Sequence, residues 1–406
     1  MANLLENIRV IDWTVWQQGP IASMMLGDLG AEVIKIEEYK RGDPGRGTMR
    51  AHDGRTREMM SGRSSYFEVN NRNKKGMAVN LKKEKGRKII RQLVEKSDVF
   101  LHNFRPESAQ KLGLDYAALS KYNPRLVYAR ASGYGSKGPE SSKVAFDYTA
   151  QARSGLMLSF GEPGMPPFYG VGGIADQIGG IFLAYGILGA LLARERLGIG
   201  QELEVSLLSS MMWTLGLNVS EKLLLGVETR RLSRHSMMNP LWNHYQCKDG
   251  QWVCLAMLQS DRYWDKLCRA LGAEELAAEE RFRTMDKRTE HCKELIALLD
   301  KLFIAKTYGE IEKAFQQEGD IIYQRVQNIS DVVEDPQALA NGYITDFPHP
   351  VLGNVKMLNC PVAFSQTPAG MRLPAPEFGQ HTEEVLTELL GYSWEEIGEL
   401  KDEEVI

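Results

Sequence analysis

The sequence predicts an α/β protein in which a parallel sheet is covered by helices on both faces, with a second, smaller α+β domain. Over the first 135 residues, short apolar runs alternate with helical patterns, as in parallel strands joined by helices. From about Leu225 this alternation gives way to a hairpin pattern and then to amphipathic helical patterns. With 406 residues, the chain is long enough to bury both cores.

The strands of the first domain are expected where short runs rich in Val, Ile and Leu occur. These runs cover residues 9–13, 32–37, 77–81, 98–104 and 125–131. Helices are expected from Pro20 to about residue 30 and over 86–96, and the uncharged run 178–193 predicts a buried helix. Ligands on such sheets bind beyond the carboxyl ends of the strands, so the loops after Trp13, Leu81 and Phe104 are the expected binding region.

The smaller domain is expected over residues 225–330. A hairpin with an Asp-Gly turn is predicted by the runs 242–246 and 251–257. Amphipathic helices should follow over 261–271, 290–303 and 308–317. We expect residues 1–224 to form the large domain together with 331–406, a segment of short strands that ends in an acidic helix near 382–390.

Composition argues against several classes of partner and compartment. The net charge is −4, and no block of Lys and Arg occurs, so nucleic acid is not an expected partner. The N-terminus lacks the pattern of a signal peptide, and the run 178–193 is shorter than the roughly 20 apolar residues that span a bilayer, so no membrane partner is expected. Five cysteines without a CxxC pair are typical of reduced thiols, which predicts a cytoplasmic protein.

Common catalytic motifs are missing or lack their context. The segment 170–175 matches GxGxxA, but 166–169 before it is no strand, and the turn over 14–20 lacks this fingerprint, so a nicotinamide or flavin enzyme is not predicted. Seven histidines show no HxxxH or HxH spacing and none pairs with Cys at zinc-ligand intervals, so no metal site is predicted. No GxSxG nucleophile motif is present.

Asp176 is the best-placed reactive group in the sequence. It lies between the glycine pairs 172–173 and 179–180, at or near the start of the predicted buried helix. Glycines let a ligand approach closely, and a helix start favours an anion. Two interpretations stay open from the residues alone: an N-cap of a core helix, or a nucleophile that attacks an activated acyl carbon.

Further segments fall in a specific order along the chain, and through them it resembles the class III CoA-transferases. This is the CaiB/BaiF-like family of formyl-CoA transferase and carnitine CoA-transferase. The resemblance covers nearly the whole chain. Its carriers are residues 10–12, 17–20, 29–37, 73–75, 103–106, 133–135, 146–148, 151–156, 198–201, 204–207 and 379–386.

The resemblance implies a Rossmann-like doubly wound large domain and an acyl-CoA:carboxylate CoA-transferase. Asp176 matches the family's nucleophile, which forms an aspartyl mixed anhydride and then an aspartyl-CoA thioester. Coenzyme A enters as the substrate acyl-CoA, and no permanently bound cofactor is implied. The implied partners are an acyl-CoA donor, a small carboxylic acid acceptor, and a second copy of the chain in an interlocked homodimer.

The resemblance also implies individual site residues. Gln17 would donate a hydrogen bond to the oxyanion that develops on the attacked carbonyl. Arg72 and Lys74 are weaker candidates for phosphate contacts, and for any basic residue a solvated surface charge is the alternative interpretation. The positions that match coenzyme A contacts are Gln18, Lys82, Asn103, Phe104, Arg105, Lys111 and Lys143.

Two alternative functions remain open, and the sequence also indicates which residues would form the acyl pocket. Phe146-Asp147 stands where related racemases of this fold carry a His-Asp pair, so proton exchange like that of an α-methylacyl-CoA racemase lacks its histidine base. A non-catalytic acyl-CoA-binding protein is the other alternative. The segment 146–156 resembles family branches that handle aryl, 2-hydroxy or enoyl acids. An apolar acyl group rather than oxalate is favoured by the expected pocket residues, for which a place in the core is the alternative interpretation: Trp16, Phe168, Tyr169, Trp213, Met237, Met238 and Trp242.

Overall fold

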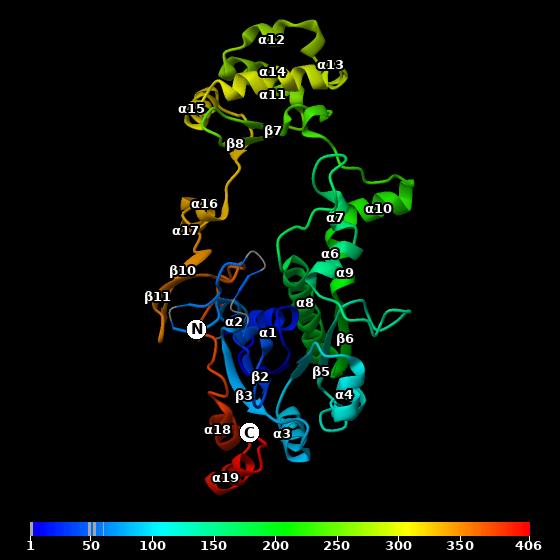
Figure 1. Cartoon of the computed structure of the whole chain (residues 1–406), viewed down its shortest axis with the longest axis vertical. Coiled ribbons are helices and arrows are strands. Elements are labelled where there is room, and N and C mark those ends of the chain that lie inside the picture. Colours follow the sequence, from blue (N-terminus) through cyan, green and yellow to red (C-terminus); the bar gives the residue numbers. More distant parts are fainter. Residues whose placement is uncertain (1–2, 48–49, 52–53, 60) are drawn as a thin grey trace. The chain divides into compact units, whose positions relative to one another are not determined.

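The computed structural model describes residues 3–47, 50–51, 54–59 and 61–406. The chain divides into two compact units (Figure 1). Unit 1 comprises residues 1–157, 169–226 and 339–406, and unit 2 comprises 158–168 and 227–338. The sequence placed the smaller domain at 225–330; the structure extends it to residue 338, which had been expected in the large domain, and adds the separate segment 158–168.

Unit 1 is built on a six-stranded parallel sheet with the order β3-β2-β1-β4-β5-β6, which confirms the predicted doubly wound α/β fold. The sixth strand was not predicted, because charged residues alternate along it and hide its apolar positions. β3 begins three residues before its predicted start, since the lysines there are part of the strand. The strands are β1 (Arg9–Trp13), β2 (Glu32–Glu38), β3 (Lys74–Val79), β4 (Val99–His102), β5 (Val127–Ser132) and β6 (Gln201–Ser206).

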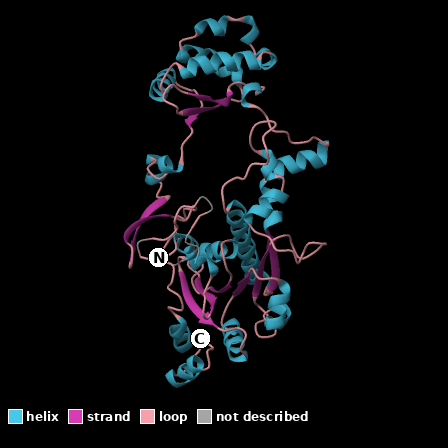
Figure 2. Ribbon diagram, viewed as in Figure 1, coloured by secondary structure: helices cyan, strands magenta, loops and turns pink. Residues whose placement is uncertain are grey.

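Helices cover both faces of this sheet. On one face, α1 (Gln18–Asp28) and α8 (Ile174–Leu197) pack on the valines and alanines of β1, β2, β4 and β5. On the other face, α3 (Glu84–Glu95), α4 (Pro106–Leu112) and α19 (Trp394–Asp402) pack on residues such as Ile11, Phe100 and Tyr128. The C-terminal segment therefore returns to the large unit, and its end lies beside β3, where Asn80 N–H donates to the Val405 carbonyl at 2.8 Å (Figure 2).

Helix α8 is longer than the uncharged run that predicted it. It spans 24 residues, because residues 174–177, including Asp176, extend it at one end and 194–197, including Arg194 and Arg196, at the other. By length and composition it could cross a membrane, but 44% of its most apolar window is buried within the protein. Leu183, Ala184 and Ile187 are fully packed against the sheet, as in the core helix of a globular unit.

The other elements of unit 1 connect these layers. The predicted C-terminal helix at 382–390 divides into a short α-helix and a π-helical turn. The elements are the 3₁₀ helix η1 (Pro44–Gly47), α2 (Ser65–Asn71), α5 (Tyr116–Leu119), α6 (Asp147–Arg153), α7 (Leu156–Ser159), which ends in unit 2, α9 (Leu207–Thr214), α10 (Gly216–Leu225), β10 (Ile344–His349), β11 (Gly353–Leu358), α18 (Thr382–Glu384) and the π-helix η4 (Val385–Leu389).

Unit 2 contains the predicted hairpin, with a third strand added from later in the chain. β7 pairs antiparallel with β8, and β8 pairs with β9. The helices bury aromatic residues against this sheet; the rings of Tyr245 and Phe303, for example, stack 4.8 Å apart. The elements are η2 (Arg234–Ser236), β7 (Trp242–Gln246), β8 (Trp252–Ala256), α11 (Ser260–Leu271), α12 (Glu274–Ala278), η3 (Glu280–Phe282), α13 (Met285–Glu290), α14 (Cys292–Ile304), α15 (Tyr308–Glu318), β9 (Tyr323–Arg325), α16 (Ile329–Val332) and α17 (Pro336–Ala340), the last of which ends in unit 1.

Buried charges join the first three strands below their carboxyl ends. Lys74 Nζ lies 2.9 Å from Asp12 Oδ2, and Lys35 Nζ lies 2.8 Å from Asp43 Oδ2, all four side chains being fully buried. The pKa of Asp12 falls to about 2: burial opposes this shift, but the charges of Lys74 and Lys35 and hydrogen bonds from Ser23 and Thr14 outweigh it. Asp12 is therefore held ionised in the core by its partners.

We predict that Lys74→Met destabilises the protein by about 3 kcal/mol, because it leaves the Asp12 carboxylate buried with only part of its compensation. The free energy of unfolding in urea, compared at equal protein concentrations, measures this loss. The matched control is Lys137→Met, which removes an exposed lysine and should change stability by less than about 0.5 kcal/mol. Equal stability of both variants would contradict a structural role for the pair.

Candidate active site

The strand order reverses between β1 and β4, and the loops that follow these two strands are joined by one side chain. Asn103, directly after β4, accepts a hydrogen bond from Val15 N–H at 2.9 Å and donates from Nδ2 to the Val15 carbonyl at 2.7 Å. Doubly wound sheets bind ligands at this reversal, beyond the carboxyl ends of the strands. The amide of Asn103 thus fixes the two loops that meet at the expected binding region.

Trp16, in the β1–α1 loop, has a left-handed backbone with φ 66°. A bulky residue seldom adopts this conformation, and such strain often occurs at functional sites. Trp16 N–H donates to Asp43 Oδ1 at 3.1 Å, and Asp43 in turn pairs with buried Lys35. Lys35 Nζ also donates to the Thr14 carbonyl at 3.0 Å, so the buried charges hold this loop from below.

Asp176 lies in the first turn of α8, but it is not the N-cap residue. The cap position is Gly173, whose φ of 83° suits glycine, and a Cβ there would lie 2.8 Å from Gln17 Oε1. The N-cap interpretation of Asp176 is therefore wrong. Instead, Asp147 Oδ1 accepts a hydrogen bond from Ala175 N–H at 2.7 Å, so a carboxylate from α6 caps the helix and leaves Asp176 free.

Asp147 is itself firmly held. Its Oδ2 accepts hydrogen bonds from Gln151 Nε2 at 2.8 Å and from Tyr169 Oη at 3.2 Å. It is buried, whereas Asp176 is partly buried and forms no hydrogen bond or ion pair with any residue that the structure describes. Asp147 is thus a fixed negative charge beside an unpaired carboxyl group.

The environment of Asp176 raises its pKa from 3.8 to about 7. Burial is the larger cause, because it removes water from the charged form, and the negative charge of Asp147 adds to it. Near neutral pH, the protonated and the ionised forms of the Asp176 carboxyl group are therefore both populated. A carboxylate of raised basicity that lies in a hollow and has no partner is suited to act as a nucleophile or a base.

Two hollows meet at Asp176, and both are also lined by Trp16 and Phe146. The first has a volume of about 280 Å³ and extends along the loops after β1, β4 and β5. The second has a volume of about 720 Å³ and extends toward α2 and the start of α6. One carboxylate therefore faces two separate spaces, as a group that handles two halves of a substrate should.

The first hollow brings together most of the positions predicted to contact coenzyme A. Phe104 packs its ring on Trp13, with centroids 4.4 Å apart, while still lining the hollow. Lys82 and Lys111 are exposed and line neither hollow, so their contacts stay predictions. The predicted residues that line the first hollow are Gln18, Asn103, Phe104, Arg105 and Lys143.

The two glutamines of the β1–α1 loop lie on different sides of the site. Gln17 lines the second hollow with its amide against Gly173. Gln18 lines the first hollow and is only 5% exposed, yet its Nε2 has no hydrogen-bond partner among the described residues. A buried donor without an acceptor is costly, so an acceptor on a bound ligand would be stabilising there.

Arg72 and Lys74, the weaker candidates for phosphate contacts, form buried ion pairs within unit 1. Arg72 binds both carboxylate oxygens of Asp28, at 3.0 and 2.6 Å. Lys74 is fully buried and bonds to Asp12, to the Pro20 carbonyl and to Asn71. Neither side chain is available to a ligand, because its charge already compensates a buried partner.

The predicted acyl-pocket residues do not all meet at Asp176. Trp16 and Tyr169 line the second hollow, whereas Trp213 lines a different, apolar hollow formed by α8, β6 and α9. The other four belong to unit 2: Phe168, Met237, Met238 and Trp242. Several residues that do line the second hollow were not predicted, because they fall in a stretch without periodicity or motif: Arg50, Arg57, Tyr66 and Asn70.

Comparison with known proteins identifies the relatives of this chain. The model of the family "CoA-transferase family III" matches residues 5–382. The (R)-2-hydroxy-4-methylpentanoate CoA-transferase of Clostridioides difficile is 33% identical, over 99% of this chain and 99% of that protein. The succinyl-CoA:glutarate CoA-transferase of Homo sapiens is 33% identical, over 98% and 88%. A CAIB/BAIF family protein from Brucella suis has a similar crystal structure, with a TM-score of 0.82 and 28% identity over 96% of this chain and 100% of that one.

We predict that Asp176→Asn stabilises the protein at pH 8 by about 1–3 kcal/mol. The pKa of Asp176 is about 7 in the folded protein and near 3.8 in the unfolded chain, so ionisation increasingly destabilises the fold as the pH rises from 4 to 7. Asparagine avoids this cost. The gain should vanish near pH 4 and stay constant above pH 7, as measured by urea unfolding across this range.

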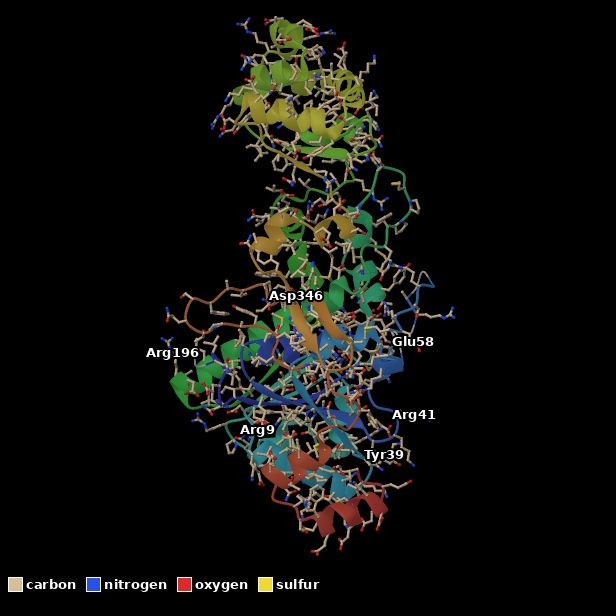
Figure 3. The ribbon with its side chains drawn as sticks, turned by 90° about the vertical axis from the view of Figure 1, so that its left-hand side faces the viewer. Arg9, Tyr39, Arg41, Glu58, Arg196 and Asp346 are labelled. Atoms are coloured by element: carbon tan, nitrogen blue, oxygen red, sulfur yellow. The ribbon has the colours of Figure 1, made fainter. Side chains whose placement is uncertain are left out.

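The matched control for this prediction is Asp346→Asn, which changes an exposed carboxylate on β10 (Figure 3). It should leave the stability unchanged at both pH values. A variant at Asp176 that is no more stable than the wild type at pH 8 would contradict the raised pKa.

Proposed function

Because the chain belongs to CoA-transferase family III, we propose that it moves coenzyme A between two carboxylic acids through covalent intermediates on Asp176. The observation that supports this most is the unpaired carboxyl group of Asp176, placed where two hollows meet and with a pKa of about 7. Coenzyme A acts as a substrate rather than as a permanently bound cofactor.

The first half-reaction opens the donor thioester. An oxygen of the Asp176 carboxylate attacks the thioester carbonyl carbon, the carbon–sulfur bond breaks, and coenzyme A leaves as the thiolate. This gives a mixed anhydride between Asp176 and the acyl group. The thiolate then attacks the Asp176 carbonyl carbon and displaces the first acid as its carboxylate, which leaves an aspartyl-CoA thioester.

The second half-reaction reverses these steps with the acceptor. The incoming carboxylate attacks the aspartyl thioester, releasing the thiolate and forming a new anhydride, and the thiolate then attacks the acyl carbonyl and frees Asp176. One thioester is broken and one is formed, so no external energy source is needed. Both intermediates can be hydrolysed, so this route requires that water be kept away from the acyl carbon during the transfer.

Two glutamine amides are suited to stabilise the charge that develops in these steps. Gln17 lies against Gly173 in the second hollow, and Gln18 offers an unpaired buried Nε2 donor in the first. A donor held in place before the reaction stabilises an oxyanion without reorganisation. We assign the first hollow to the thiol end of coenzyme A, and Arg105 and Lys143, which also line it, to phosphate oxygens.

Racemase-like proton exchange has less support. Phe146, at the position of the expected histidine, is 58% exposed and cannot accept a proton. No histidine of the described chain lines either hollow. Asp147 is held by three hydrogen bonds as a helix cap, so Asp176 lacks the second base that such an exchange requires.

The covalent route predicts that Asp176 alone is trapped during turnover. With wild-type protein and an acyl-CoA, hydroxylamine should convert Asp176 to its hydroxamate, seen as a mass shift on the peptide that contains it. Asp176→Asn and Asp176→Ala should reduce exchange by at least about 10³-fold while still binding coenzyme A. Full exchange by these variants would contradict the covalent route, and binding by the wild type without exchange would support the non-catalytic alternative.

We also propose that two copies form a homodimer, in the cytoplasm. Helix α10 has no buried residue, and Leu217, Leu223 and Leu224 are 74–82% exposed. The apolar hollow beside Trp213 and Tyr185 is open as well. Surfaces this apolar are usually covered by a partner. All five cysteines are free, which suits a reducing compartment.

Light scattering on the purified protein should give twice the chain mass of 45.7 kDa at micromolar concentration. Leu224→Glu places a charge in the exposed apolar surface of α10, so it should weaken assembly or lower the yield of folded protein. The control Glu221→Gln, on the same helix, should leave the mass unchanged. A monodisperse wild-type monomer would contradict the dimer.

A further inference from the structure

Two arginines, Arg50 and Arg57, line the second hollow. Neither Arg50 nor Arg57 forms an ion pair with any residue that the structure describes, although most other arginines of unit 1 are paired. Arg57 packs its guanidinium over the ring of Tyr66, 4.9 Å from the ring centroid. Unpaired cations that line a hollow beside a reactive group usually recognise an anionic part of the substrate.

The same hollow links Arg57 to the reacting carboxylate through Tyr66. Burial raises the pKa of Tyr66, the negative charge of Asp176 raises it further, and the positive charge of Arg57 lowers it. The Tyr66 hydroxyl therefore stays protonated between a negative and a positive group. The ring of Trp16, 6.5 Å from that of Tyr66, and the paired rings of Tyr148 and Tyr169 provide the aromatic walls.

The geometry points to an acyl group that carries a second carboxylate at its far end, so the transferred species is the half-thioester of a dicarboxylic acid. This inference rests on the proposed function. The reacting carbonyl would lie at Asp176, the short chain between the aromatic rings, and the distal carboxylate at Arg57, with Arg50 beside it. At about 720 Å³ the hollow is large enough for such a chain.

A polar acyl end explains the composition of this hollow better than the apolar acyl group that the sequence favoured. A hydrocarbon tail would leave the partly buried guanidinium group of Arg57 without an anion, which is unfavourable, whereas the exposed Arg50 stays solvated. The phosphates of coenzyme A are assigned above to two other basic residues, Arg105 and Lys143, which line the first hollow. Arg57 is therefore assigned to the acyl end and not to the nucleotide.

The test compares two four-carbon thioesters that differ only at the far end: succinyl-CoA with labelled succinate, and butyryl-CoA with labelled butyrate. Exchange of label is followed by mass spectrometry. The wild type should have at least about a 10-fold higher kcat/KM for succinyl-CoA. Arg57→Met should lower that value by roughly 10- to 100-fold and leave butyryl-CoA within about 2-fold, while Arg57→Lys should retain part of the preference.

A matched control removes an arginine from outside the hollow. Arg41 is exposed on the surface of unit 1 (Figure 3), and Arg41→Met should leave both substrates unaffected. An equal loss on both substrates in Arg57→Met, or a wild type that prefers butyryl-CoA, would overturn the assignment while the CoA-transferase function stands. Exchange with neither thioester nor with any other acyl-CoA would overturn the proposed function itself.

Discussion

The position of one carboxylate beside another, at the start of a core helix, is the constraint on which this site depends. The N-terminus of α8 needs an acceptor for its free amide groups, and Asp147 from a different helix supplies it at Ala175. Asp176, one residue further along, therefore does not have to accept hydrogen bonds from the free amides at the start of α8. It is left partly buried, unpaired and close to a fixed negative charge, and these conditions together raise its pKa to about 7.

The rest of unit 1 serves to hold the groups around that carboxylate. The reversal of strand order between β1 and β4 brings two loops together, and Asn103 fixes them with a pair of hydrogen bonds to Val15. Below them, the buried pairs of Lys35 with Asp43 and of Lys74 with Asp12 support the strained backbone at Trp16. Ion pairs this deep contribute little net stability, so their value here is in fixing the geometry of the loop.

The sequence predicted the fold well where patterns repeat. Val, Ile and Leu runs separated by helical patterns predicted five of the six strands, and α8 was expected from its uncharged run. The sixth strand was missed because Glu202 and Glu204 interrupt its apolar positions. The start of β3 was missed because Lys74 and Lys75 are charged, and only the tertiary structure shows that Lys74 has a buried partner.

Some residues of the site could be predicted from the sequence and others could not, for a physical reason. Family resemblance located Asp176, at the start of α8, and five coenzyme A positions, most of which lie on loops after strands, and the structure brings them to one place. The capping by Asp147 and the arginines of the second hollow depend on contacts between segments about 30 to more than 100 residues apart, which no local pattern records. Trp213, expected in the acyl pocket, lines a different hollow, because aromatic side chains also build cores and surfaces.

The most direct measurement of the central claim is the ionisation of Asp176 itself. Carbon-13 NMR of protein labelled at the aspartate carboxyl carbon, with the resonance assigned by its loss in Asp176→Asn, follows this group as the pH is changed. We expect a titration midpoint near 7 in the protein without substrate. A midpoint near 4, the value of an ordinary solvated aspartate, would contradict it.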